Sequence, residues 1–191
     1  MNEFRQSDFS YAEVKEVSFL FNEDTVAESV TCIGSSELEL ETRTITKKCG
    51  VKVQKSRTKA TGNGTDKLNI RIPWDLYVTM FAMDQEGLEE GVTAYGEESL
   101  HPTFTYCKRT LDEDGEEMLI AHPNATIKSN QTVKIDNSAE DIAAVDLEIA
   151  IMPDEYGNGT YQTVVKDLPE GSQIAKTWMT NFTPELVQKS A

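Results

Sequence analysis

The stretch from residue 50 to residue 83 constrains the fold most, because it predicts a long β-hairpin followed by a short helix. Polar and apolar residues alternate from Val51 onward, and a period of two favours a strand. Residues 61–64, Thr-Gly-Asn-Gly, have turn chemistry with two glycines that tolerate positive φ. Alternation resumes over residues 68–72. The sequence therefore predicts a hairpin whose turn lies at residues 61–64.

The segment after the hairpin predicts a helix over residues 73–83. Pro73 suits the first helical position, where its missing N–H leaves no hydrogen bond unmade. An apolar stripe at helical spacing follows, formed by Leu76, Tyr77, Met80, Phe81 and Trp74. We therefore expect this helix to lie on a sheet, with Trp74, Tyr77 and Phe81 as core residues.

The hairpin is basic, although the chain as a whole is acidic. The sequence has 33 acidic and 18 basic residues, a formal charge of −15, but seven Lys or Arg and no acidic residue fall between Thr42 and Thr65. The distal half of the hairpin has no large apolar side chain, and isolated hairpins are marginal in water. We predict an arm over residues 47–66 that becomes ordered against an acidic surface of another copy. The residues assigned to this contact are Lys52, Lys55, Arg57, Lys59 and Asn63.

Short alternating segments dominate the rest of the chain and predict a mainly β fold. We expect the chain to consist of a flexible arm at residues 1–10, one domain at residues 11–168, and a C-terminal arm with short helical turns at residues 169–191. We expect a β-sandwich or half-open barrel with one flanking helix. The predicted strands cover residues 11–21, 26–33, 37–46, 101–108, 117–120, 124–128, 131–136 and 144–151, with a break at 34–36, an acidic loop at 84–98 and a turn at 112–115.

No motif in the chain predicts catalysis, a cofactor or a metal. The three cysteines lack C-x-x-C spacing, and the acidic turn at 112–117 lacks the ligand spacing of a calcium loop. His101 and His122 have no recognisable nucleophile beside them. The polar residues 2–10 do not suggest a signal peptide, and no apolar run approaches a membrane span. We expect a non-enzymatic protein, made in the cytoplasm, with reduced thiols and no membrane.

Nucleic acid is the obvious alternative partner for a basic arm. A strongly acidic chain repels phosphates, however, and the arm has no aromatic residues between its bases for stacking on nucleotides. An acidic neighbour is therefore favoured over direct binding to nucleic acid.

Six segments together resemble the major tail (tail tube) proteins of long-tailed, siphovirus-type bacteriophages, most closely those infecting Gram-positive hosts. From residue 50 to residue 185 they span about seven-tenths of the chain, and the resemblance rests on their order and spacing. They are G-V-x-V-x7-T-G-x-G-T at 50–65, P-W-D-L-Y-x-x-M-F-x-M at 73–83, GLEEGVTAYG at 87–96, LDEDGEE at 111–117, MPDEYGNG at 152–159 and WMTNFTPE at 178–185.

This resemblance implies a structural virion protein. In that family a sandwich with one helix assembles into hexameric rings, and the inner sheets join into one barrel around a lumen. Stacked rings form a tube, with other tail proteins at its ends, through which double-stranded DNA passes without being bound. The alternative is a monomeric β-sandwich module that binds a ligand or carbohydrate.

A tube that lets DNA pass needs an electronegative wall, because Lys and Arg on the wall would pair with phosphates. The candidates are strand carboxylates opposite apolar faces, namely Glu37, Glu39, Glu41, Asp146 and Glu148. Near the C-terminus, Trp178 and Phe182 are either core residues or anchors that dock a C-terminal arm on a neighbour.

Overall fold

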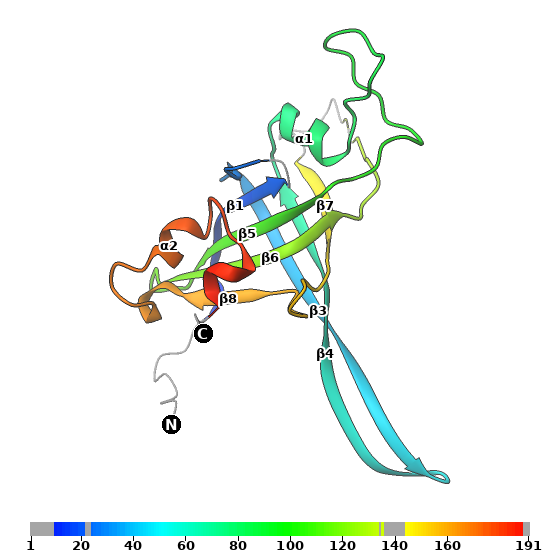
Figure 1. The fold of residues 1–191 in the computed structure, drawn as a ribbon, viewed down its shortest axis with the longest axis vertical. Coiled ribbons are helices and arrows are strands. Elements are labelled where there is room, and N and C mark those ends of the chain that lie inside the picture. Colours follow the sequence, from blue (N-terminus) through cyan, green and yellow to red (C-terminus); the bar gives the residue numbers. More distant parts are fainter. Residues whose placement is uncertain (1–9, 22–23, 134, 136–143, 189–191) are drawn as a thin grey trace.

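The structure of the protein is a computed structural model that describes residues 10–21, 24–133, 135 and 144–188. The fold is mainly β with one flanking helix, as the alternation predicts (Figure 1). Except for Ser10, the predicted N-terminal arm lies outside the described residues. The strands are β1 (Glu13–Phe21), β2 (Glu28–Val30), β3 (Ile33–Cys49), β4 (Lys52–Ile70), β5 (Thr103–Leu111), β6 (Glu117–Ile127), β7 (Val145–Ile151) and β8 (Tyr161–Val164). The helices are α1 (Trp74–Met80) and α2 (Gln173–Thr177), with 3-10 turns η1 (Val165–Asp167) and η2 (Pro184–Val187).

All described strands form one antiparallel sheet in the order β2-β1-β5-β6-β7-β4-β3. The sheet forks at β6, because the first half of this strand pairs with β8 and its last three residues pair with β7. The sheet also curves, so that β1 contacts β3 near the other edge. The result is a half-open barrel.

The main core fills the concave side of this sheet. Alternation along the strands turns one set of apolar side chains inward, including Phe19, Ile70, Phe104 and Ile149. Helix α1 covers them with Leu76, Tyr77 and Met80, and Phe81, directly after the helix, packs in the same cluster. Full burial of a large apolar side chain contributes about 1.5–3 kcal/mol, so this cluster dominates the stability of the fold.

The prediction that Trp74 is a core residue is wrong, because this residue is 58% exposed. It is the first residue of a helix of only seven residues and stacks on Tyr77 from outside, with ring centroids 5.6 Å apart. Pro73 is the residue before the helix rather than its first residue.

A second core lies on the other face of β5 and β6 and corrects the prediction of a C-terminal arm. Trp178 and Phe182 are 1% and 2% exposed, with ring centroids 4.6 Å apart, and pack with Cys107, Leu119 and Ala121. The Ser172 hydroxyl caps α2 by accepting a hydrogen bond from the Ile174 N–H. These aromatic residues are therefore core residues of their own chain, not anchors on a neighbour.

The hairpin turn lies elsewhere than the turn chemistry at 61–64 predicts. β3 and β4 are joined by Gly50 and Val51, next to the directly paired residues Cys49 and Lys52. Gly50 has φ +61° and Val51 does not have positive φ, which suits a type II′ hairpin turn with glycine first. The predicted turn at 61–64 is wrong, and these residues lie inside β4.

Three further strand predictions are wrong, the last of them as far as its residues are described. β3 runs straight through residues 34–36, where a break was expected, with only a register shift between Ile33 and Ser35. β6 continues to Ile127 instead of ending near residue 120, because Pro123 falls at a register irregularity, where its missing N–H is tolerated. Residues 131–133 and 135 are not in a strand, and the rest of the predicted strand at 131–136 lies outside the described residues.

Candidate assembly surfaces

The described hairpin extends far beyond the sheet. β4 pairs with β7 only from Gly64 to Ile70. From there toward the tip of the hairpin, β3 and β4 pair with each other (Figure 1). We call residues 41–63 the arm. Every residue from 41 to 60 is exposed, so this part of the chain adds almost nothing to the core. The exposed hairpin thus begins earlier than the predicted boundary at residue 47.

The strand register divides the arm into two chemically distinct faces. Directly paired residues share a face. The basic face consists of the pairs Arg43–Lys59, Ile45–Arg57 and Lys47–Lys55. The opposite, hydroxyl face consists of Thr42–Ala60, Thr44–Thr58 and Thr46–Ser56. Like charges directly opposite each other destabilise a hairpin, so the basic face disfavours the arm in isolation.

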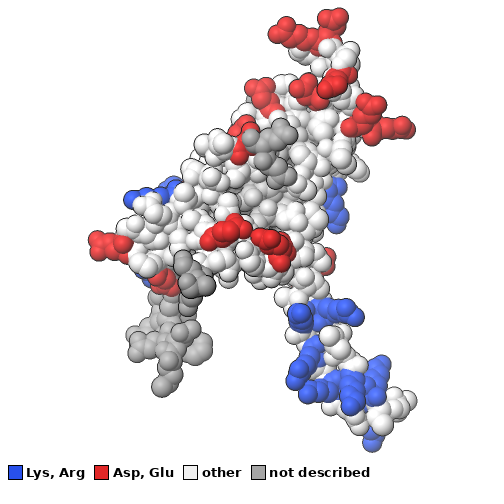
Figure 2. All heavy atoms as spheres, in the orientation of Figure 1, with Lys and Arg blue, Asp and Glu red and all other residues white. Residues whose placement is uncertain are grey.

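The residues assigned to the arm contact are not all in one place. Lys55, Arg57 and Lys59 lie together on the basic face. Lys52 lies at the tip, paired with Cys49, whereas Asn63 lies at the root, where the arm leaves the body. Figure 2 shows Lys and Arg side chains gathered along the arm.

A bulge forms the root of the arm. Leu40 pairs with Gly64 and Thr42 pairs with Ala60, so Glu41 alone faces residues 61–63. The Thr61 hydroxyl donates to the Glu41 carbonyl oxygen at 3.3 Å and accepts from the Asn63 N–H at 3.2 Å. Gly62 adopts φ +85°, which explains the glycine. Bulges bend and twist a strand, so this element aims the arm.

The loop between β7 and β8 presses against this root. A Cβ added to Gly159 would lie 1.7 Å from the Gly62 carbonyl oxygen, so the two backbones touch. The Asp154 carboxylate shapes the loop by accepting hydrogen bonds from the N–H groups of Tyr156 and Asn158, both at 2.9 Å. Two glycine segments that look like separate turns in the sequence therefore form one contact.

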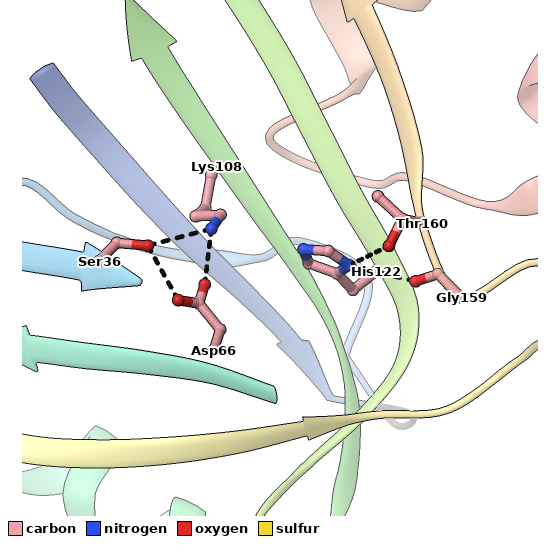
Figure 3. Close-up of polar contacts among 6 residues, drawn as sticks. All are labelled: Ser36, Asp66, Lys108, His122, Gly159 and Thr160. Atoms are coloured by element: carbon pink, nitrogen blue, oxygen red, sulfur yellow. Dashed lines mark hydrogen bonds and ion pairs between the residues drawn. The ribbon is translucent and has the colours of Figure 1, made fainter. Parts of the chain in front are cut away.

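A buried polar network ties both strands of the arm to the centre of the sheet (Figure 3). Asp66 of β4 is 0% exposed and Lys108 of β5 is 3% exposed, and Lys108 Nζ lies 2.6 Å from Asp66 Oδ2. The Ser36 hydroxyl of β3 donates to Asp66 Oδ1 at 2.9 Å and accepts from Lys108 Nζ at 3.0 Å. Burial, together with the Asp66 carboxylate, raises the pKa of the neighbouring Tyr106 well above its usual value.

His122 lies buried at the fork of the sheet. Its Nδ1 is 3.1 Å from the Gly159 carbonyl oxygen and 3.1 Å from the Thr160 hydroxyl (Figure 3). A carbonyl oxygen only accepts, so Nδ1 carries the proton of the neutral ring. Burial, and then the charge of Lys108, lower the pKa of His122 to about 4. The ring holds the β7–β8 loop against β6 and has a structural role.

The buried His122 predicts a specific dependence of stability on pH. The unfolded chain protonates this ring near pH 6.5, whereas the folded protein does so only near pH 4, so the unfolded state binds more protons between these values. The stability contribution is complete above pH 6.5 and is lost as the pH falls to 4. Across this window we expect the unmodified protein to lose on the order of 2–3 kcal/mol more than His122→Asn, measured by urea unfolding. Parallel curves for the two proteins would contradict a buried neutral ring.

The structure brings the five candidate wall carboxylates to one exposed face of β3, β4 and β7. They lie opposite the buried side chains of Leu68, Leu147 and Ile149. We call the surface formed by Glu37, Glu39, Glu41, Asp146 and Glu148 the carboxylate face.

The negative charge of the carboxylate face is partly compensated by side chains of β4, which runs between the two acidic strands. Lys67 Nζ lies 3.3 Å from Glu37 Oε2, and Asn69 Nδ2 donates to Asp146 Oδ1 at 2.7 Å. Along β3 the same side of the strand changes from acidic at Glu37–Glu41 to basic at Arg43 and Lys47. The sign of the charge therefore reverses where the bulge re-aims the arm.

Within the described ranges, no group of three or more His, Cys, Asp and Glu side chains is placed to bind a metal ion. The helices of that part of the chain are also too short or too polar to cross a membrane.

Sequence reasoning missed the network of Ser36, Asp66 and Lys108. A signal was present, because Asp66 has the same phase along β4 as Leu68 and Ile70, and Lys108 has the same phase along β5 as Tyr106. A charge at a core-phase position on each of two strands predicts a buried pair if the strands are known to approach.

No protein-family model matches the chain, and no curated protein matches it significantly in sequence. The solved structures that are similar to it include two chains of the anti-feeding prophage. One is a chain of the anti-feeding prophage baseplate, with 14% identity and a TM-score of 0.47 over 84% of this chain and 99% of that chain. The other belongs to the tube-terminating cap of the anti-feeding prophage, with 11% identity and a TM-score of 0.48 over 85% and 97% of the two chains. Both TM-scores are below 0.5, so neither similarity assigns a function to this chain.

Proposed function

We propose that this protein is the structural, non-catalytic subunit of a phage tail tube, assembling into stacked hexameric rings that conduct double-stranded DNA. The observation that carries the proposal is the arm, whose residues 41–60 are all exposed and whose basic pairs lie directly opposite each other. A hairpin of this kind gains stability only from a partner. The segments quoted above as resembling tail tube proteins motivate the choice of assembly.

The charge of the chain points to another copy as that partner. Because the chain carries a net charge of −15 despite its basic arm, the rest of each subunit is strongly acidic. An arm that contacts a neighbouring subunit therefore exchanges repulsion within its own hairpin for attraction across an interface. Each exposed ion pair contributes only about 0.2–1 kcal/mol, but such contacts recur in every subunit of a ring.

The carboxylate face supports the proposal that the assembled tube conducts DNA. Four strands in the order β6-β7-β4-β3 end at the outer edge of β3, and the exposed side of the last three carries the candidate wall residues. An edge strand is suited to pairing with another chain. We propose that this face lines the lumen, where its carboxylates repel the phosphates of passing DNA. A high-resolution map of the tube with a lumen lined mainly by Lys and Arg would contradict this.

The test is to reverse the charge of the arm. We expect the triple variant Lys55→Glu, Arg57→Glu, Lys59→Glu to remain folded, with the thermal transition of the unmodified monomer, because these side chains are exposed. The same variant is expected to form no tubes by negative-stain electron microscopy, whereas the charge-conserving variant Lys55→Arg, Arg57→Lys, Lys59→Arg forms them. High salt is expected to weaken assembly of the unmodified protein.

Two outcomes would count against the proposal. Undisturbed tubes from the triple-Glu variant would show that the charge of the arm is incidental. An unmodified protein that stays monomeric at high concentration would favour the monomeric ligand-binding module instead.

A further inference from the structure

The two ends of the molecule carry opposite charge. The arm projects at one end of the long axis, and the loop between α1 and β5 projects at the other (Figures 1 and 2). We call residues 84–98 the acidic loop. It contains no Lys or Arg and presents six exposed carboxylates, those of Asp84, Glu86, Glu89, Glu90, Glu97 and Glu98. None of the six forms an ion pair with another described residue.

The acidic loop is held in a defined shape by contacts at its base. The Ala94 N–H donates to the Met83 carbonyl oxygen at 3.0 Å. The Gln85 side-chain amide donates to the Ala94 carbonyl oxygen at 3.3 Å and to the Ser99 hydroxyl at 3.0 Å. The ring of Tyr95 contacts Phe81 edge to face, with centroids 6.1 Å apart. The carboxylates therefore belong to a built surface that is present before any partner arrives.

Both ends also expose aliphatic side chains among their charges. On the acidic loop these are Leu88 and Val92. On the arm they are Ile45, Val53 and Val51, the last of which is 98% exposed at the tip. Apolar contacts surrounded by complementary charges are the usual composition of a protein interface. The two ends match each other in both respects.

The carboxylate face is the competing acidic partner for the arm, and it is the weaker candidate. Glu37 already has Lys67 beside it, and Asp146 already accepts a hydrogen bond from Asn69. The acidic loop has no such compensating base, so a cationic partner gains more there.

We infer that the arm of one copy docks with its basic face on the acidic loop of the next copy, along the long axis of the molecule. The inference rests on the proposed function and names the surface that the arm contacts. In one copy the two surfaces lie at opposite ends, so they meet only between copies (Figure 2). The arm reaches roughly 30 Å beyond its root at about 3.3 Å per residue. Such a head-to-tail contact is heterologous, and when it runs along the long axis without a rotation that closes a ring, it propagates as a stack.

The experiment pairs two charge reversals. The arm variant is Lys55→Glu, Arg57→Glu, Lys59→Glu, and the loop variant is Glu86→Lys, Glu89→Lys, Glu90→Lys. We expect neither to form tubes alone, because each variant removes the net charge of one docking surface. The basic face keeps two bases beside three new carboxylates, and the acidic loop keeps three carboxylates beside three new lysines. Mixed in equal amounts, the two should associate in sedimentation velocity, since each supplies the surface that the other lacks. One chain carrying all six changes lacks both charged surfaces and should form no tubes.

A matched control changes the same number of exposed acidic residues away from the loop, in Asp114→Lys, Glu155→Lys, Glu170→Lys. When these three substitutions are added to the loop variant, we expect its association with the arm variant to remain unchanged. Zero-length carbodiimide cross-linking of assembled unmodified protein should join arm lysines to loop glutamates, read by mass spectrometry.

The outcomes separate this inference from the proposed function. A loop variant that forms tubes normally, or mixed arm and loop variants that fail to associate while remaining folded, would overturn the docking of the arm on the loop. Loss of tubes in the arm variant would still support the proposed function in either case. If the unmodified protein formed no tubes, the proposed function would be wrong. Association of the two mixed variants would still establish the contact between the arm and the acidic loop.

Discussion

Replacing Lys108 with alanine is expected to lower the free energy of unfolding by about 3–5 kcal/mol. The change leaves the Asp66 carboxylate without its cation in a site where Asp66 is fully buried. An unpaired buried charge is far more costly than the pair, and the Ser36 hydroxyl alone offers one hydrogen bond to it. Urea unfolding at neutral pH, with and without the substitution, measures the loss.

Two comparisons make this result specific to the buried pair. Lys108→Met combined with Asp66→Leu removes both charges with little change in volume and is expected to recover most of the lost stability. Glu37→Gln removes the exposed Lys67–Glu37 pair and is expected to change stability by less than about 1 kcal/mol. If Lys108→Ala stayed within 1 kcal/mol of the unmodified protein, the network would not hold the strands together.

The network shows where a pattern of alternating residues succeeds and where it fails. Alternation placed Leu147 and Ile149 inside and Asp146 and Glu148 outside, as the structure has them. The same alternation gives Asp66 the inward phase of Leu68 and Ile70, but it does not show what would neutralise a charge there. Only the approach of β3, β4 and β5 in space gives this carboxylate its partners.

The position of the hairpin turn was missed for a related reason. Residues 61–64 have better turn chemistry than Gly50-Val51, so local preference favours the wrong site. In the structure Gly62 is needed for positive φ in a bulge and for contact with the β7–β8 loop, which is a non-local reason for glycine. The aromatic residues near the C-terminus posed the same difficulty, because a sequence does not say whether Trp178 packs on its own sheet or on a neighbour's.

Replacing Gly159 with alanine is expected to destabilise the fold by about 3 kcal/mol, at the upper end of the usual range for overpacking. The added Cβ would lie 1.7 Å from the Gly62 carbonyl oxygen and 2.8 Å from its carbonyl carbon, so two backbones must separate. Backbone atoms cannot rotate away as a side chain does. The shift would also disturb the hydrogen bond that His122 donates to the Gly159 carbonyl oxygen.

Gly157→Ala is the matched control, because Gly157 lies in the same loop but its added Cβ meets nothing within 4 Å. Its φ of +78° alone makes alanine unfavourable, by about 1–2 kcal/mol. Urea unfolding should rank Gly159→Ala below Gly157→Ala, and amide exchange at residues 61–64 should accelerate only in the former. Because the bulge aims the arm, Gly159→Ala should also impair tube formation at a temperature where the subunit is still folded. Equal stability and equal exchange for the two variants would show that the β7–β8 loop does not support the root of the arm.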